Sequence, residues 1–266
     1  MLKFGDSAVP QRGHSELKYQ KRKYHLQAEM AAVPLSLRGT ALFFKAPGKL
    51  YTERVNAYKD TYMKYCALTF DDGPSGLTHL VLDRLEKYSI PATFFVVGKC
   101  ITEETRPVME RICSLSCEFA NHSWSFEPMD SMTPEEMNRS LKKTDDKIRF
   151  YTGSAAVFFR PPNLAVSKVL YDSVTKPFAQ GITANDWIGC NTTAEQRADL
   201  VLSQVTDGSI ILLHDTQIPP HPTPEALDIF IPELLKKDFS FVTLSSLFDL
   251  KGINPNSLKN AMWSCV

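Results

Sequence analysis

The chain has 266 residues, of which 43% are apolar and 23% charged, with 30 basic and 30 acidic side chains. This composition allows a sizeable core and excludes a fibrous or disordered chain. No apolar run reaches the length of a membrane span, and six cysteines in a chain of this length exclude a fold held mainly by disulfides.

The first quarter of the chain is basic and has no regular periodicity. Residues 1–65 contain 12 Lys or Arg against 5 acids, whereas the remainder contains 18 against 25. We therefore predict a basic, poorly defined extension over residues 1–60 and a folded domain over residues 61–266. The extension lacks the aromatic and repeated basic pattern of a nucleic-acid module, so no nucleic-acid partner is expected. Its first thirty residues also lack the apolar core of a signal peptide, which indicates either a cytosolic protein or a natural start different from the one given.

From Cys66 onward, short apolar runs alternate with longer amphipathic ones, a rhythm typical of parallel strands wrapped by helices. The first expected strand begins at Cys66. The others cover about 92–97, 118–120, 157–159, 181–184, 209–213 and 239–244. Helices are expected over about 80–88, 107–115 and 223–237. A further helix is predicted to begin after Thr133, where Thr133 and Glu136 form a capping box. Seven strands with helices between them predict an α/β fold, an incomplete (β/α)7-type barrel.

The first predicted strand ends in two adjacent acids, Asp71 and Asp72, followed by Gly73-Pro74. Successive strand residues point to opposite faces, so both acids can face one site only if the backbone turns there. One carboxylate could then hold a metal ion while the other handles a proton. The alternative is a hairpin turn with two solvated acids, since Asp-Gly is a common turn pair.

Ionisable residues follow the other strands in the same way. In a (β/α) barrel the carboxyl ends of the strands meet on one face, so we expect these side chains to gather at one mouth. The predicted set is Asp71, Asp72, His122, Arg160, Asp186 and His214.

Two of these segments resemble a known family closely. The sequence Thr69-Phe70-Asp71-Asp72-Gly73-Pro74-Ser75 resembles the first motif of the polysaccharide deacetylases, the NodB-homology carbohydrate esterases that include chitin deacetylases. The segment from Ser209 to His214 resembles their fifth motif. The resemblance covers about residues 62–250 and implies a distorted (β/α)7-type barrel.

The resemblance implies a divalent metal ion, Zn or Co, held by Asp72 and His122. Family members have a second metal-binding histidine where this chain has Phe126. A catalytic zinc site needs about three protein ligands and an open position, so two ligands would bind the ion weakly.

The resemblance also implies the catalytic roles. Asp71 would be the base and Arg160 would orient it and keep it ionised. His214 would be the acid that protonates the leaving group, and pairing with Asp186 would raise its pKa.

Three further residues are implied in substrate binding. The backbone N–H of Asn163 would hold the oxyanion, Leu212 would line an acetyl pocket, and Trp187 would stack on a sugar or line the groove. The implied substrates are chitin or N-acetylglucosamine oligomers, deacetylated by a monomer that is secreted or lies at the cell surface or cell wall. The resemblance further implies a disulfide between Cys66 and Cys265. The histidines that match no motif are predicted to lie on the surface: His14, His25, His79 and His221.

Two other functions fit the same sequence. Phe126 favours a degenerate member that binds a glycan or a partner without turnover, whereas the acid and base residues favour an enzyme. A phosphohydrolase using Asp71 is the third alternative, although its usual Asp-x-Asp pattern and a Gly-rich phosphate loop are missing from the sequence.

Overall fold

A computed structural model describes residues 63–216 and 221–266. The predicted extension over residues 1–60 lies outside the described residues. None of the described helices combines the length and apolarity needed to cross a membrane.

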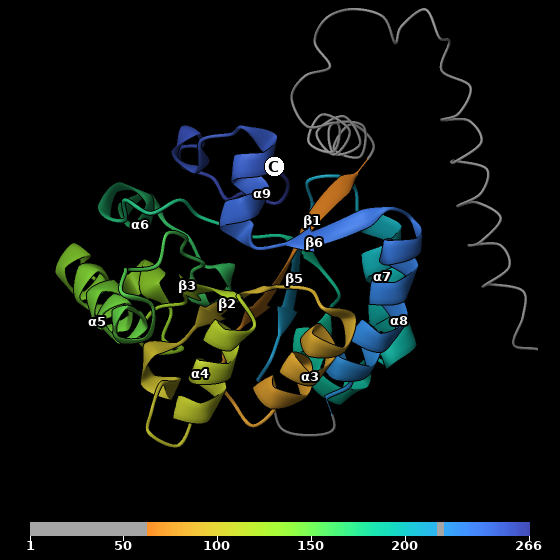
Figure 1. Cartoon of the computed structure of the whole chain (residues 1–266). Helices are drawn as coiled ribbons and strands as arrows, with labels where there is room; N and C mark the ends of the chain where they lie inside the picture. The colour runs from red at the N-terminus through yellow and green to blue at the C-terminus, as the bar shows by residue number, and fades with distance from the viewer. Residues whose placement is uncertain (1–62, 217–220) are drawn as a thin grey trace, which may run out of the picture. The chain divides into compact units, whose positions relative to one another are not determined.

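The described part of the chain forms a parallel sheet surrounded by helices (Figure 1). Its strands are β1 (Lys64–Asp71), β2 (Thr93–Val96), β3 (Glu118–Asn121), β4 (Ile182–Thr183), β5 (Ile210–His214) and β6 (Phe239–Val242). Its α-helices are α3 (Thr78–Tyr88), α4 (Arg106–Ser114), α5 (Pro134–Thr152), α6 (Lys168–Ser173), α7 (Ala194–Gln204), α8 (Thr223–Lys236) and α9 (Leu244–Lys251). The predicted α/β class and the alternation of strands and helices are confirmed.

Strand β1 is the centre of the sheet. It pairs with β5 along one side, while β6 and β2 share the other side, and all these pairings are parallel. The sheet order is β3-β2-β1-β5-β4, with β6 against the first half of β1. Residues of β1 therefore have sheet neighbours on both sides.

One predicted strand is not formed as a strand. In the segment 157–159, Phe159 makes isolated parallel bridges to Asn121 and to Phe178. The ladder cannot continue because Arg160 is followed by Pro161 and Pro162, which have no N–H to donate. These bridges still connect β3 to the segment that leads into β4, so the barrel-like arrangement continues where the fourth strand was expected.

Side chains alternate between the two faces of β1. Cys66, Leu68 and Phe70 pack in a cluster with residues of α3, α4 and α8, on the helix side of the sheet. Ala67 belongs to a second cluster, with Phe95, Phe158 and residues of α9. Thr69 and Asp71 continue this inner row, so alternation brings Asp71 to the interior at the strand's carboxyl end.

The C-terminal segment closes the other end of the barrel. Trp263 packs on Phe248 of α9 with ring centroids 5.1 Å apart, and its indole N–H donates to the carbonyl of Pro255. The same segment makes isolated bridges from Trp263 to Ala179 and from Cys265 to Ser209. The barrel interior is thus apolar near the start of β1 and polar near its end.

The disulfide implied between Cys66 and Cys265 is wrong, since both cysteines are free. Cys66 is buried on the helix side of β1, whereas Cys265 is exposed and its Sγ lies near the carbonyl of Asp207. The C-terminal segment packs with Tyr65 on the other face of β1. Cys66 and the C-terminal segment that carries Cys265 therefore lie on opposite faces of β1.

The predicted helix start at Thr133 is confirmed in detail. The Thr133 side chain accepts from the N–H of Glu136, and the Glu136 carboxylate accepts from the N–H of Thr133. A second capping box, between Thr193 and Gln196, begins α7, a helix that was not predicted from the sequence.

Candidate active site

A pocket of about 530 Å³ opens at the carboxyl ends of β1 and β5. Four of the six ionisable residues predicted to converge line it, namely Asp71, Asp72, His122 and His214. The other two, Arg160 and Asp186, are fully buried beside it and pair with pocket residues. The rest of the lining consists of Phe126, Pro162, Asn163, Leu164, Thr183, Trp187 and Leu212.

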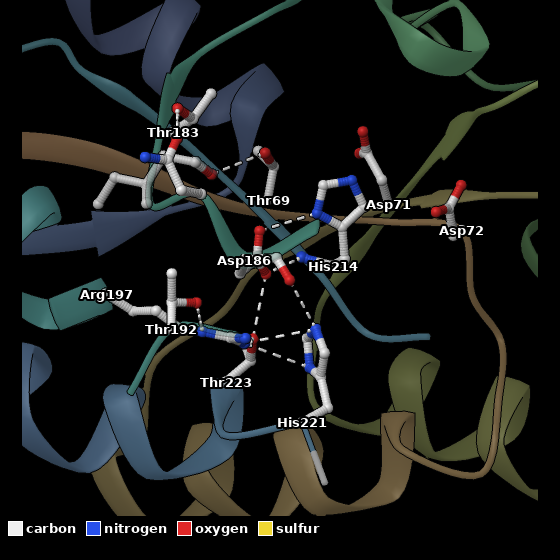
Figure 2. A network of polar contacts seen from close by, with 12 residues as sticks. Thr69, Asp71, Asp72, Thr183, Asp186, Thr192, Arg197, His214, His221 and Thr223 are labelled. Atoms are coloured by element: carbon white, nitrogen blue, oxygen red, sulfur yellow. Dashed lines mark hydrogen bonds and ion pairs between the residues drawn. The ribbon is translucent and has the colours of Figure 1, made fainter. Parts of the chain in front are cut away.

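The two adjacent acids reach the pocket by different routes. Asp71 is the last residue of β1 and points into the barrel through strand alternation. Asp72 has φ of 75°, so the backbone turns immediately after the strand and carries the second carboxylate to the same pocket. The predicted turn after the strand is therefore present. Figure 2 shows both carboxylates near His214.

Arg160 holds Asp71 from inside the barrel. Its Nη1 donates to Asp71 Oδ1 at 2.5 Å and to Thr69 Oγ1 at 3.0 Å. Its Nε donates to the carbonyl of Ala179, and the ring centroid of Phe95 lies 3.9 Å from the guanidinium carbon. A side chain bound on so many sides can hold the carboxylate in one orientation.

A ring nitrogen of His122 lies close to a carboxylate oxygen of Asp72 in the pocket. The carbonyl of Arg160 lies 2.7 Å from His122 Nδ1 and can only accept, so Nδ1 carries a proton. His122 Nε2 then faces Asp72 Oδ1 at 3.2 Å and Asp71 Oδ2 at 3.9 Å. A ring nitrogen fixed by a carbonyl behind it, opposite a carboxylate, is the arrangement of metal-binding histidines.

The charge on Asp72 also suits a cation. Burial raises its pKa, but the hydrogen bond and charge of His122 and the charge of His214 outweigh burial and lower the pKa overall. Phe126 lines the pocket near these two residues and offers no ligand atom. Across residues 63–216 and 221–266, no group of three His, Cys, Asp or Glu side chains is arranged to hold a metal. Asp72 and His122 thus fit a divalent ion as a two-residue site completed by water.

His214 pairs with Asp186 through two hydrogen bonds. Its ring Nδ1 lies 2.9 Å from Asp186 Oδ1, and its backbone N–H donates to Asp186 Oδ2 at 2.7 Å. Burial lowers the pKa of His214, but the hydrogen bond and the charges of Asp186, Asp71 and Asp72 outweigh it and raise the pKa to about 9. The imidazole is therefore protonated at neutral pH, with Nε2 as the ring nitrogen that remains for chemistry in the pocket.

Asp71 and His214 are neighbours in the sheet. The register of β1 and β5 places Asp71 opposite His214, and Thr69 opposite Leu212. On β5, Leu212 and His214 alternate with the helix-facing Ile211 and Leu213, so His214 lies on the inner face of the sheet, as Asp71 does on β1. A carboxylate and an imidazolium thus face one pocket from adjacent strands, which is suited to proton transfer in both directions.

The residues predicted to contact substrate also line the pocket. Leu212 is among the lining residues, and Asn163 belongs to a segment in which both Asn163 and Leu164 have positive φ, 57° and 53°. Left-handed backbone at two consecutive side-chain-bearing residues is uncommon, and strained backbone of this kind is found repeatedly at functional sites. Trp187 is 49% exposed and Phe126 is 50% exposed, so both offer an aromatic surface to solvent at the pocket.

Two buried groups beside the site were not anticipated. His221 was predicted to lie on the surface, but it is 5% exposed and its Nε2 donates to the carbonyl of Asp186. It stands next to Arg197, another buried side chain that has no place in any of the motifs. A histidine before a proline gave no sequence signal for burial, because the groups that it contacts, Arg197 and the carbonyl of Asp186, lie 24 and 35 residues away in the sequence.

Asp215 is the third group that sequence reasoning missed. Its side chain is fully buried, Oδ2 accepts from Thr78 Oγ1 at 2.6 Å, and Oδ1 has no partner among the described residues. Burial raises its pKa to about 7, and the charges of Asp72 and Asp71 add to this against the Thr78 hydrogen bond. A Cβ at Gly73 would lie 2.3 Å from Asp215 Oδ2, so this carboxyl closely backs the turn that carries Asp72.

Known proteins are similar to this chain in sequence and in fold. A family model described as polysaccharide deacetylase matches residues 58–176. A family 4 acetyl xylan esterase from Clostridium thermocellum, solved in complex with a cobalt ion, has a TM-score of 0.74 and 49% sequence identity, covering 76% of this chain and 99% of that one.

Two curated proteins extend the comparison. A bifunctional xylanase/deacetylase of Pseudobutyrivibrio xylanivorans is 42% identical over 76% of this chain, and a peptidoglycan-N-acetylglucosamine deacetylase of Listeria monocytogenes is 31% identical over 71%. The chain spans 33% of the length of the first and 40% of the second. The similarity thus covers one segment of these longer proteins.

Proposed function

Since the chain belongs to the polysaccharide deacetylase family, we propose that it removes acetyl groups from a glycan by metal-assisted hydrolysis. The observation that carries the proposal is the pairing of Asp71 with His214 across adjacent strands, each held by its own buried partner. Hydrolysis of an acetyl group needs a base for the attacking water and an acid for the leaving group, and this pair can supply both.

In the proposed reaction Asp71 accepts a proton from the attacking water, while Arg160 holds the carboxylate in place. His214, kept protonated by Asp186, gives a proton to the departing oxygen or nitrogen. The backbone N–H of Asn163 is proposed to stabilise the oxyanion, and Leu212 to contact the acetyl methyl group.

Asp72 and His122 are the proposed ligands of the metal. A divalent ion such as Zn²⁺ or Co²⁺ bound there supplies Lewis-acid chemistry, which polarises an acetyl carbonyl and makes water more acidic. The cobalt complex of the similar acetyl xylan esterase supports this part of the proposal.

Two substrate classes follow from the sequence and the comparisons. The sequence motifs indicate polymers of N-acetylglucosamine, such as chitin or its oligomers. The relatives with 49% and 42% identity are a xylan esterase and a xylanase/deacetylase, which favours O-acetylated xylan. We propose acetylated xylan as the first candidate and N-acetylglucosamine oligomers as the second. Such substrates lie outside cells, so secretion or a cell-surface location, and action as a monomer, are parts of the proposal.

Acetate release tests the proposal. The full chain, supplied with Zn²⁺ or Co²⁺, is incubated with acetylated xylan and with N-acetylglucosamine oligomers. Release from at least one is expected, with a roughly 100-fold or larger loss in Asp71→Asn and in the presence of a chelator. A lack of acetate from both substrates, with metal bound, would contradict the proposal.

The second candidate function is glycan binding without turnover. The two-residue metal site favours it, since Phe126 stands where family members have a third ligand. Acetate release by Phe126→His, but not by the natural chain, would support the binder. Release by the natural chain would exclude it.

A further inference from the structure

A chain of hydrogen bonds continues from His214 into the protein beyond Asp186. Thr223 Oγ1 lies 3.1 Å from Asp186 Oδ2, and Arg197 Nη1 lies 2.7 Å from the same Thr223 oxygen. All of these side chains are buried, apart from a small exposed part of His214. Figure 2 shows Asp186 between His214 on one side and Thr223, Arg197 and His221 on the other.

The direction of each bond in this chain is determined by chemistry. Arginine carries only donors, so Thr223 must accept from Arg197, and its single hydroxyl proton must point to Asp186. Asp186 Oδ2 therefore receives the Thr223 hydroxyl and the His214 backbone N–H. Only Oδ1 is left to receive the imidazole Nδ1–H.

Arg197 is itself fixed by its other contacts. Its Nε donates to Thr192 Oγ1 at 2.9 Å, and its Nη1 lies 3.5 Å from His221 Nδ1, the ring nitrogen that can accept. His221 Nε2 donates to the carbonyl of Asp186 at 2.9 Å, and burial together with the charge of Arg197 lowers the His221 pKa. A neutral His221 thus holds the backbone of Asp186 while Arg197 acts on its carboxylate through Thr223.

The network joins four separate elements. Asp186 begins the 3-10 helix Asp186–Asn191, Arg197 lies on α7, Thr223 is the first residue of α8, and His214 is the last residue of β5. Without Thr223, Asp186 Oδ2 would be held by the His214 backbone N–H alone, which leaves the carboxylate more freedom to rotate about its side-chain bonds. The contacts from α7 and α8 remove that freedom.

From this arrangement we propose that Thr223 and Arg197 are positioning residues for His214. They lock the Asp186 carboxylate in the rotamer that binds Nδ1, and so aim His214 Nε2 into the pocket. This inference deepens the proposed function and rests on it for the role of His214 as the acid.

The test compares Thr223→Val with Thr223→Ser. Valine keeps the shape of threonine without the hydroxyl, whereas serine keeps the hydroxyl. Loss of a hydrogen-bond partner behind a functional group commonly costs 10-fold to 100-fold in activity. We expect Thr223→Val to lower kcat for acetate release about 10-fold with KM within twofold of the natural chain, and Thr223→Ser to restore kcat to within about threefold.

Thr93→Val is the matched control. Thr93 is also fully buried and hydrogen-bonded, but it starts β2 at the opposite end of the barrel, where it contacts Glu118 and the N–H of Leu244. Its substitution should lower the melting temperature and leave kcat within twofold. Equal kcat values for Thr223→Val and Thr93→Val, or a Thr223→Ser as slow as Thr223→Val, would overturn the inference.

A second measurement does not need turnover. The Nδ1–H proton of His214, assigned by its loss in His214→Gln, should give a low-field NMR signal in the natural chain and in Thr223→Ser. It should broaden or disappear in Thr223→Val because Asp186 Oδ2 then keeps only the His214 backbone N–H and the carboxylate is held less firmly. An unchanged signal in Thr223→Val would overturn the inference. If the natural chain releases no acetate, the proposed function fails, and this spectrum still decides whether Thr223 positions His214.

Discussion

Phe126 stands at the pocket position where the resemblance implies a second metal-binding imidazole, in addition to His122. It lines the same pocket as Asp72 and His122. We predict that Phe126→His raises the affinity for Zn²⁺ at least 10-fold, because it adds a third protein ligand. Isothermal titration calorimetry measures the change, with Phe126→Gln as the control that is polar but has no imidazole. Equal affinities for the two variants would contradict the prediction.

The pairing of His214 with Asp186 predicts a pH dependence. The pKa of His214 is raised to about 9 from its ordinary 6.5, so the acid form is present below pH 9 and is lost as pH rises through that value. We expect kcat/KM to fall above about pH 9. In Asp186→Asn the charge that raises the pKa is removed, so the fall should begin at lower pH. A pH profile with the same descending limb in both proteins would rule out this assignment.

The same shift predicts how stability depends on pH. A pKa that is higher in the folded protein gives stability that is fully present below pH 6.5 and lost between about pH 6.5 and 9. The size is on the order of 3 kcal/mol if His214 titrates normally in the unfolded chain. Urea unfolding at pH 6 and pH 9.5 measures it, and the difference should shrink in His214→Gln.

Residues that follow a strand could be predicted from the sequence, whereas the buried His221 and Arg197, which belong to no strand end, could not. Asp71, Asp72, His122 and His214 each follow an apolar run, and barrel geometry then brings them to one pocket. The position of His221 depends on the packing of helices far apart in sequence. A short sequence motif cannot predict such long-range packing.

At the scale of elements, the turn after β1 depends on a glycine. A Cβ at Gly73 would lie 2.3 to 2.5 Å from the two carboxylate oxygens of Asp215. We predict that Gly73→Ala lowers the free energy of unfolding by about 2 kcal/mol and displaces Asp72, since the buried carboxyl cannot move into solvent. Urea unfolding and Zn²⁺ affinity measure the two effects.

Gly76→Ala is the matched control for this prediction. Gly76 is exposed, lies three residues further along the same loop, and has nothing within 4 Å of a built Cβ. Its substitution should leave both stability and Zn²⁺ affinity nearly unchanged. If the two alanine variants behave alike, the close approach of Asp215 is not what requires glycine at position 73.

The sequence predicted the long elements better than the short ones. Helices α3, α5 and α8 have clear apolar periodicity or a capping box, and they form close to the expected bounds. The segment 157–159 has the composition of a strand, but two prolines after Arg160 reduce it to single bridges. The extended backbone of this segment was thus predicted correctly, but the prolines that follow it limit the strand pairing to isolated bridges.

At the scale of the whole domain, the C-terminal segment closes the barrel. Trp263 packs on Phe248, in the cluster that also contains Ala67 and Phe95, and it makes a parallel bridge to Ala179. We predict that Trp263→Ala lowers the free energy of unfolding by about 2 kcal/mol, less than a fully buried tryptophan costs because Trp263 is only partly buried. Leu250→Ala, at a 52% exposed position, should cost under about 0.5 kcal/mol. Similar losses in both variants would show that the segment does not support the barrel.

The convergence of the site and the failed disulfide follow from the same property of strands. Alternation puts Asp71 and His214 on the inner face, where they meet. It also puts Cys66 on the outer face, away from Cys265. The resemblance could suggest a disulfide partner for Cys66, but it does not show on which face of the sheet each cysteine lies.

The central place of β1 has a consequence for motion. Its amides and carbonyls are bonded to β5 on one side and to β6 and β2 on the other. Amide hydrogens in such a strand exchange with solvent only when the entire domain opens. Deuterium uptake over residues 66–71 should therefore be the slowest in the domain, and the backbone of Asp71 should stay in place when less stable parts of the domain open.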